Sequence, residues 1–417
     1  MSVAKRIDLD YLTTTPLHPE VRGAMAAVEA SGGGSPASYH RGGVRAREAV
    51  KLGREQAAAL VGAGSAESMI FTGSGTEALN LAIKGSAWAG YGKGRHIVLT
   101  GVEHPAVDRS VAFLERQGFE ATRVGVDEQG FLDPAELEAA IRPETFLVCV
   151  HHAQADLGSV QDLASICRVV EPSGALLLVD ATASGGWVPV DVSELPIDLL
   201  ALSPHRFGGP KGVGVLYRHR RARLESLVHG GNQEYGLRGG TENVLGIVGA
   251  GRAAEVALRD WEVWVKHVRG LRHSLWGRLT EEIPLLRLNG PALGERRLPH
   301  HLNVSVEFVE GEGLVLALDF QGVSIHSGPA CMTGSNKIAP ALKAAGLSSG
   351  LAKGSVMMST GIETTLGDVE EAVGRIAKVV LKLRGMSPMW EAYCEGRVGS
   401  EMGDGRSDIG DRRWDIG

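Results

Sequence analysis

The sequence predicts an α/β fold in which helices cover a mostly parallel sheet, followed by a smaller α+β domain. From about residue 66, short apolar runs alternate with helical patterns. These runs are apolar at odd and even positions alike, as strands buried on both faces should be. Strands that alternate with helices form parallel sheets through crossover connections. Past about Arg252 the alternation stops, and a long helical stretch bearing Trp and Arg leads into a second unit.

The first unit supplies four strand candidates and four helices. The strands are expected at residues 68–72, 96–100, 145–150 and 175–179. The helices between them are expected at residues 76–88, 105–117, 134–141 and 162–170. The second unit should contain a helix at 253–279, a strand at 301–308, a helix at 311–320, a strand at 355–359 and a helix at 366–383. We therefore predict a large domain at 1–255, a small domain at 256–385 and a flexible tail at 386–417.

Composition excludes several classes of protein. The 43 Lys and Arg residues against 49 Asp and Glu residues give a net charge of −6, without the basic stripe of a nucleic-acid binder. Four cysteines in 417 residues do not form a disulfide framework. The first residues lack the apolar core of a signal peptide, and no apolar run reaches the ~18 residues of a membrane span. We expect a cytoplasmic protein with no nucleic-acid or membrane partner.

Two motifs at the ends of predicted strands indicate ligand binding. In the run 71–81, FTGSGTEALNL, a strand ends in a Gly-rich turn and a helix begins. Backbone N–H groups and the helix dipole then converge on one point, which is typical of a phosphate site at Gly75 and Thr76; a plain turn is the alternative. In LVDAT, Asp180 follows a buried strand at the sheet edge where ligands bind. Its carboxylate would pair with a protonated ring nitrogen or, alternatively, cap a helix.

With a third motif, LSPHRFGGPKGVGVLY at 202–217, the chain resembles the fold-type I pyridoxal phosphate (PLP) enzymes of the class V aminotransferase group. It is most similar to the cysteine desulfurases, from about residue 10 to about residue 384. Further motifs support this: VEHPAV at 102–107, HGGNQEYGLRGGTEN at 229–243 and HSGPACMTG at 326–334.

The resemblance implies a PLP-dependent transferase fold, a homodimer and a set of site residues. The cofactor phosphate would be held by Gly75, Thr76, Ser203, His205 and, across the dimer, Thr241. The cofactor ring would lie between His104 and Asp180. Cys331 would be the cysteine that accepts sulfur.

The chain departs from the family pattern at four positions of this site. Arg206 stands in the place of the Schiff-base lysine, and a guanidinium cannot supply the neutral amine that imine formation needs. Ala155 and Ala183 replace the two amides that would bind the ring oxygen. Met357 replaces the Arg that would clamp the substrate carboxylate. The resemblance therefore implies PLP, or a similar phosphate, bound without a covalent bond, with Arg206 able to pair with its phosphate.

Three functions remain open at this stage, and whether the chain is an enzyme is left open with them. The first is a sulfur-handling protein without imine chemistry, in which Cys331 carries sulfur or holds an Fe–S cluster for a sulfur acceptor or Fe–S scaffold partner. The second is an active PLP-dependent cysteine desulfurase or lyase with a non-standard site. The third is a non-catalytic dimeric scaffold for sulfur-pathway partners.

The other cysteines and the paired histidines are assigned structural roles. Cys149 in an apolar strand and Cys167 on a helix are expected to be packing residues. Neither the pair at 151–152 nor the pair at 300–301 should chelate a metal, because adjacent strand residues point to opposite faces.

Overall fold

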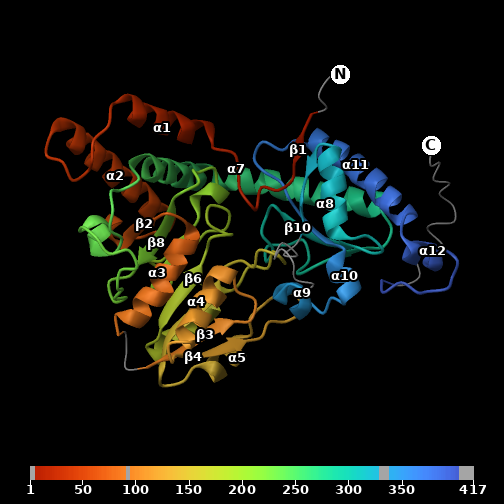
Figure 1. Ribbon diagram of the computed structural model, residues 1–417, viewed down its shortest axis with the longest axis horizontal. Coiled ribbons are helices and arrows are strands. Elements are labelled where there is room, and N and C mark those ends of the chain that lie inside the picture. Colours follow the sequence, from red (N-terminus) through yellow and green to blue (C-terminus); the bar gives the residue numbers. More distant parts are fainter. Residues whose placement is uncertain (1–4, 91–93, 328–337, 403–417) are drawn as a thin grey trace.

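The computed structural model describes residues 5–90, 94–327 and 338–402, and its two main sheets lie toward the two ends of an elongated molecule (Figure 1). The larger sheet has seven strands in the order β2-β8-β7-β6-β5-β3-β4. Strand β8 is antiparallel to both neighbours, and the other pairs are parallel. The strands are β2 (Met69–Thr72), β3 (His96–Thr100), β4 (Glu120–Val124), β5 (Thr145–His151), β6 (Leu176–Asp180), β7 (Leu199–Leu202) and β8 (Gly214–Arg218).

Helices cover both faces of this sheet, which explains why its inner strands carry apolar residues at odd and even positions alike. Along β5, Val148 and Val150 belong to one hydrophobic cluster, while Leu147 and Cys149 belong to the cluster on the opposite face. The helices of this part are α1 (Pro19–Ala30), α2 (Arg41–Leu60), α3 (Gly75–Trp88), α4 (Pro105–Glu115), α5 (Pro134–Ala140) and α6 (Leu163–Val170). Short 3-10 turns lie at Ala66–Ser68, Glu171–Ser173, Pro204–Arg206 and Gln233–Gly236. The predicted α/β fold with a mostly parallel sheet is confirmed.

The second sheet has four strands in the order β12-β13-β10-β9, all antiparallel to their neighbours. Its hydrophobic core is formed with the helices α7, α8 and α11. The strands are β9 (Leu286–Leu288), β10 (His301–Val306), β12 (His326–Ser327) and β13 (Ser355–Ser359). The helices are α8 (Gly311–Phe320), α9 (Pro340–Ala344), α10 (Ser349–Lys353), α11 (Leu366–Gly385) and α12 (Pro388–Cys394). A parallel pair, β1 (Ile7–Asp8) with β11 (Val323–Ser324), ties the start of the chain to this unit.

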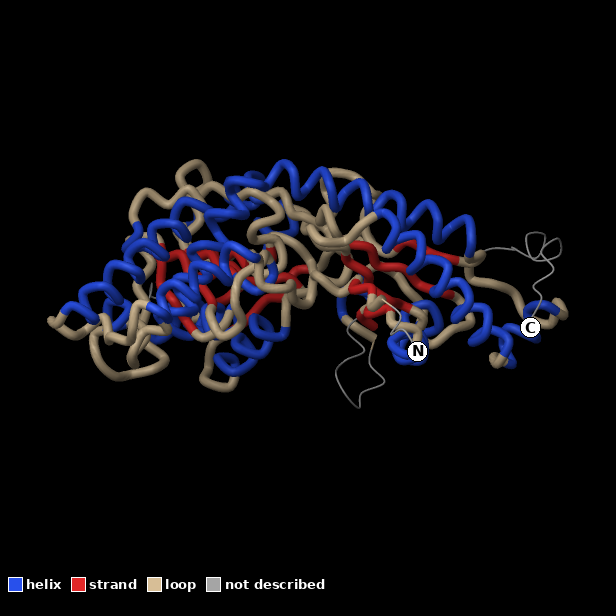
Figure 2. Tube along the Cα trace, turned by 90° about the horizontal axis from the view of Figure 1, so that it is seen from above, coloured by secondary structure: helices blue, strands red, loops and turns tan. Residues whose placement is uncertain are grey.

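One long helix, α7 (Val244–Glu282), joins the two units. It is longer at both ends than the helix expected at 253–279. Asn243 caps it, because its side-chain oxygen accepts a hydrogen bond from Gly246 N at 3.0 Å. Ile247 packs in the core of the large sheet, and Leu275 packs in the core of the small one. Figure 2 shows the two groups of strands with helices running along both.

The described part of the expected tail contains a helix. Tyr393 of α12 is fully buried and stacks on Phe308, with ring centroids 5.1 Å apart. Trp390 joins the same aromatic group. Three aromatic side chains thus hold residues 388–394 against the small unit. The prediction of a flexible tail did not anticipate this contact. In the described residues, no helix is long and apolar enough to cross a membrane.

Candidate cofactor site

The predicted phosphate turn lies where β2 leads into α3, at the carboxyl ends of the parallel strands. Ser74 caps the helix by accepting a hydrogen bond from Glu77 N at 3.1 Å. Gly75 is buried so tightly that a Cβ there would lie 3.1 Å from Ser203 Oγ and 2.8 Å from Thr182 Cγ2. The helix N-terminus, Ser203 and the loop after β6 therefore meet at one place. Thr76 is exposed in the first turn of α3.

The two predicted ring contacts come from adjoining parts of the same sheet edge. Asp180 is 3% exposed at the end of β6, and its Oδ1 accepts a hydrogen bond from Thr182 N at 2.9 Å. His104 is the exposed N-cap of α4, where its Nδ1 accepts a hydrogen bond from Ala106 N at 3.0 Å. Its Nε2 has no hydrogen-bond partner among the residues that the structure describes. This arrangement offers an aromatic face and a carboxylate to a ring.

Arg206 ends the short helical turn that follows β7. Its carbonyl oxygen accepts a hydrogen bond from Trp187 Nε1 at 2.8 Å, which fixes the backbone of this turn. Burial lowers the pKa of its guanidinium, and three carboxylates oppose that shift: those of Asp180, Asp10 and Asp156. Among the described residues, no carboxylate lies within 4.0 Å of its guanidinium nitrogens. Arg206 stays protonated at neutral pH and keeps a charge that is free to meet an anionic group.

His205, one residue earlier, is neutral at pH 7. Burial, with Arg206 and Lys211 nearby, lowers its pKa to about 4. Its Nδ1 lies 3.2 Å from Thr14 Oγ1, so the start of the chain packs directly against this turn. Thr15 strengthens the contact, because both its N–H and its hydroxyl donate to His205 O. The lysine in this stretch, Lys211, is exposed.

The place expected for the substrate clamp is apolar. Met357 on β13 is 5% exposed and belongs to a hydrophobic cluster with Leu12, Ala183 and Leu298. Ala155 packs against the same cluster. Both alanines that replace the family's amides are therefore part of a closed apolar surface. The side chains of Met357, Ala155 and Ala183 themselves carry no hydrogen-bond donor for a phenolic oxygen or a carboxylate.

These contacts fit PLP in part. A helix N-terminus, Ser203, His104, Asp180 and the Arg206 guanidinium, which pairs with no carboxylate in the described ranges, suit a phosphorylated heterocycle. An imine bond does not fit, because the family's lysine position holds Arg206. When bound in proteins, PLP supplies an electron-withdrawing ring. Here Asp180 would hold the ring nitrogen, His104 would cover the ring, and the start of α3 would hold the phosphate.

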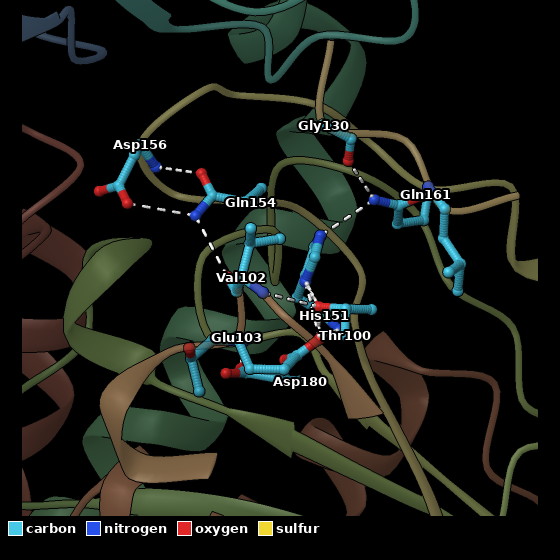
Figure 3. A network of polar contacts seen from close by, with 11 residues as sticks. Thr100, Val102, Glu103, Gly130, His151, Gln154, Asp156, Gln161 and Asp180 are labelled. Atoms are coloured by element: carbon cyan, nitrogen blue, oxygen red, sulfur yellow. Dashed lines mark hydrogen bonds and ion pairs between the residues drawn. The ribbon is translucent and has the colours of Figure 1, made fainter. Parts of the chain in front are cut away.

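Sequence reasoning missed a buried polar network beneath the ring contacts (Figure 3). Glu103 Oε1 accepts hydrogen bonds from His151 Nδ1 at 2.8 Å and from Thr100 Oγ1 at 2.7 Å. On the other side of the imidazole, Gln161 Nε2 donates to His151 Nε2 at 2.9 Å. His151 was considered only as half of a metal-binding pair. A signal was available, because Glu103 immediately precedes His104.

The remaining predicted residues have mixed outcomes. Cys149 and Cys167 are 1% and 3% exposed and pack in cores, as expected, and Cys394 is exposed. Within the described ranges, no group of three or more His, Cys, Asp or Glu residues could hold a metal ion. Thr241 is exposed in the loop before α7. Cys331 lies outside the described residues.

A mostly parallel seven-stranded sheet covered by helices, followed by a second α+β unit, is the arrangement of the PLP-transferase class of fold. The comparisons with known proteins agree. The family model for class V aminotransferases matches residues 7–371, and the chain belongs to this family.

Individual relatives are similar over almost the whole chain. A cysteine desulfurase IscS of Dictyoglomus turgidum is 39% identical over 384 residues, 92% of this chain and 97% of the relative. A cysteine desulfurase IscS of Salmonella schwarzengrund is 42% identical over 395 residues, 94% of this chain and 96% of the relative. A solved NifS-like protein has a TM-score of 0.84 at 31% identity, covering 90% of this chain and 100% of that one. SspA in complex with cysteine has a TM-score of 0.74 at 30% identity, covering 86% and 100%.

Proposed function

We propose that this chain is a sulfur-transfer protein of the cysteine desulfurase type that holds PLP, or a similar phosphate, without a covalent bond. The observation that carries the proposal is Arg206. Its guanidinium lies near Asp10, Asp156 and Asp180 yet pairs with none of them in the described structure. A permanently charged guanidinium suits a phosphate and does not suit an imine. Met357 also disfavours extraction of sulfur from free cysteine, because its side chain cannot bind the cysteine carboxylate.

Sulfur would then arrive on a persulfide of a donor protein or small thiol. The Cys331 thiolate would attack the outer sulfur of that persulfide, the donor S–S bond would break, and its electron pair would leave with the donor thiolate. Cys331 would end as the persulfide and pass its sulfur to an acceptor protein or Fe–S scaffold. This role for Cys331 rests on the HSGPACMTG motif. An Fe–S cluster held through Cys331 is the alternative use of the same thiol.

The proposal includes a homodimer in the cytoplasm. Thr241 is exposed in the loop between Arg238 and α7, in a segment that resembles the one by which the family completes the phosphate site of the neighbouring subunit. Size measurements should give a mass of about twice 44.0 kDa. Thr241→Ala should weaken phosphate binding only if the dimer forms.

Two experiments test the function. Borohydride treatment of PLP-loaded protein should leave no pyridoxyl group on any lysine by mass spectrometry, and a modified Lys211 would overturn the non-covalent site. After incubation with a persulfide donor, wild type should carry a persulfide that Cys331→Ala lacks, with Cys394→Ala as the matched control. If Cys331→Ala carries as much persulfide as wild type, Cys331 is not the carrier and the non-catalytic scaffold becomes the better function.

A further inference from the structure

The network around Glu103 links the turn after β3, which leads directly to His104, with the end of β5, which pairs with the end of β6 at Asp180 (Figure 3). Glu103 lies in the turn after β3, immediately before His104. His151 is the last residue of β5, and the sheet register places it opposite Asp180 on β6. The Glu103 side chain has no exposed surface, and that of His151 is 4% exposed. A buried pair therefore lies between the residue that would cover a ring and the residue that would hold its nitrogen.

The hydrogen bonds of Gln161 fix the direction of the bonds that run from Gln161 through His151 to Glu103. Gln161 Oε1 accepts from Leu132 N at 3.1 Å, so the amide nitrogen must face Gly130 O at 2.8 Å and His151 Nε2 at 2.9 Å. His151 Nε2 is then the acceptor, and Nδ1 carries the proton donated to Glu103. This single tautomer holds the imidazole in one orientation.

All donors to Glu103 converge on one carboxylate oxygen. Oε1 accepts from Thr100 Oγ1, from His151 Nδ1 and from His151 N at 3.0 Å. Oε2 is buried and has no partner among the described residues. Three hydrogen bonds to one ionised oxygen lock the turn after β3 to the end of β5, and charge-assisted bonds are the stronger kind.

We propose that Glu103 and His151 are positioning residues that fix the His104 ring relative to the Asp180 carboxylate. The proposal rests on the non-covalent ring site proposed above. Asp180 is tied to the same element, because His152 N donates to Asp180 O at 2.8 Å. Removal of these hydrogen bonds should weaken the binding of a heterocyclic ring. It should leave phosphate binding at the start of α3 unchanged, because no network residue belongs to that turn.

Binding of PLP and of inorganic phosphate tests this division. A hydrogen bond to a charged group is worth about 1.5–3 kcal/mol, or about 12–150-fold in an equilibrium constant. Part of this free energy should contribute to ring binding through the position of His104. We therefore expect His151→Gln to raise the Kd for PLP by about tenfold. The Kd for inorganic phosphate should change less than about twofold. Glu103→Gln, which keeps an acceptor for His151 and Thr100 but removes the charge, should show a smaller rise.

The chain offers a matched control on the same two strands. His96 at the start of β3 is 2% exposed, and its Nδ1 lies 2.7 Å from Thr145 Oγ1 at the start of β5. His96→Gln therefore removes a comparable buried imidazole at the opposite end of the strands. It should lower the melting temperature without changing PLP affinity relative to phosphate affinity.

Three results would overturn the positioning role. Equal losses of PLP affinity in His96→Gln and His151→Gln would show a general effect on folding. Equal losses of affinity for PLP and for phosphate would show that the network does not act on ring binding specifically. Wild-type protein that binds PLP no better than inorganic phosphate would leave no ring to position. None of these depends on Cys331, so they remain separate from a failure of sulfur transfer.

Discussion

Changing Met357 to Arg tests whether loss of the carboxylate clamp keeps free amino acids out of the site. In the native chain, Met357 presents only an apolar contact, because it is 5% exposed against Leu12 and Ala183. Residues 357 and 359 share one face of β13, and Asp10 forms a β-bridge with Ser359. An arginine at position 357 would therefore have a carboxylate within reach, which limits the cost of burying its charge.

The size of the effect follows from the hydrogen bonds that the new guanidinium would make. Charge-assisted bonds contribute about 1.5–3 kcal/mol, which corresponds to about 12–150-fold in a dissociation constant. We expect the variant Arg206→Lys with Met357→Arg to bind L-cysteine at least ~12-fold more tightly than Arg206→Lys alone. The gain should stay below the upper end of this range, because Ala155 and Ala183 still leave the ring oxygen without a donor.

Calorimetric titration under anaerobic conditions measures the difference. Cysteamine, which lacks the carboxylate, serves as the ligand control, and Met357→Leu serves as the protein control. The reasoning is refuted if cysteamine gains as much affinity as L-cysteine, or if Met357→Leu reproduces the gain. Sulfide release from L-cysteine by the wild-type chain at a rate equal to that of the double variant would refute it as well.

Three further predictions concern stability and thiol reactivity. Glu234→Ala should lower the free energy of unfolding by about 3–5 kcal/mol in denaturant titrations, because it leaves a buried guanidinium unpaired; an unchanged midpoint would contradict this. Cys167, whose pKa burial raises to about 11, should alkylate far more slowly at pH 8 than the exposed Cys394, as peptide mapping would show. Burial lowers the pKa of His152 and His300 to about 3, so both gain protons on unfolding and stability should fall as pH drops from 6.5 toward 3. Calorimetry should show a shallower fall in His300→Phe, and an identical pH profile would contradict the assignment.

The strands that the sequence predicted well are buried on both faces. The expected strands at 68–72 and 175–179 are found within one residue as β2 and β6, and the helix at 311–320 is found with its exact bounds. Strand β4 was not predicted because its residues are mostly exposed or half-buried at the sheet edge, so they carry no apolar run. Helix α12 was not predicted because aromatic contacts with a distant residue, Phe308, hold it in place.

In the candidate site, local features could be predicted from the sequence, and contacts between distant segments could not. Local motifs predicted the α3 turn and Asp180, since each lies at the end of a recognisable strand. The charges around Arg206 could not be predicted from the motif that contains it, because Asp10 and Asp156 come from segments far away in sequence. The hydrogen-bond partners of His151 could not be predicted for the same reason. Its partners, Glu103 and Gln161, approach from two different loops.

The continuity of α7 has a consequence for how the protein can move. A helix of 39 residues is about 58 Å long, and it contains no proline. Because its first turns are fixed in one core and its last turns in the other, it acts as a strut between them. Any rotation of one unit against the other would have to bend this strut against its own hydrogen bonds.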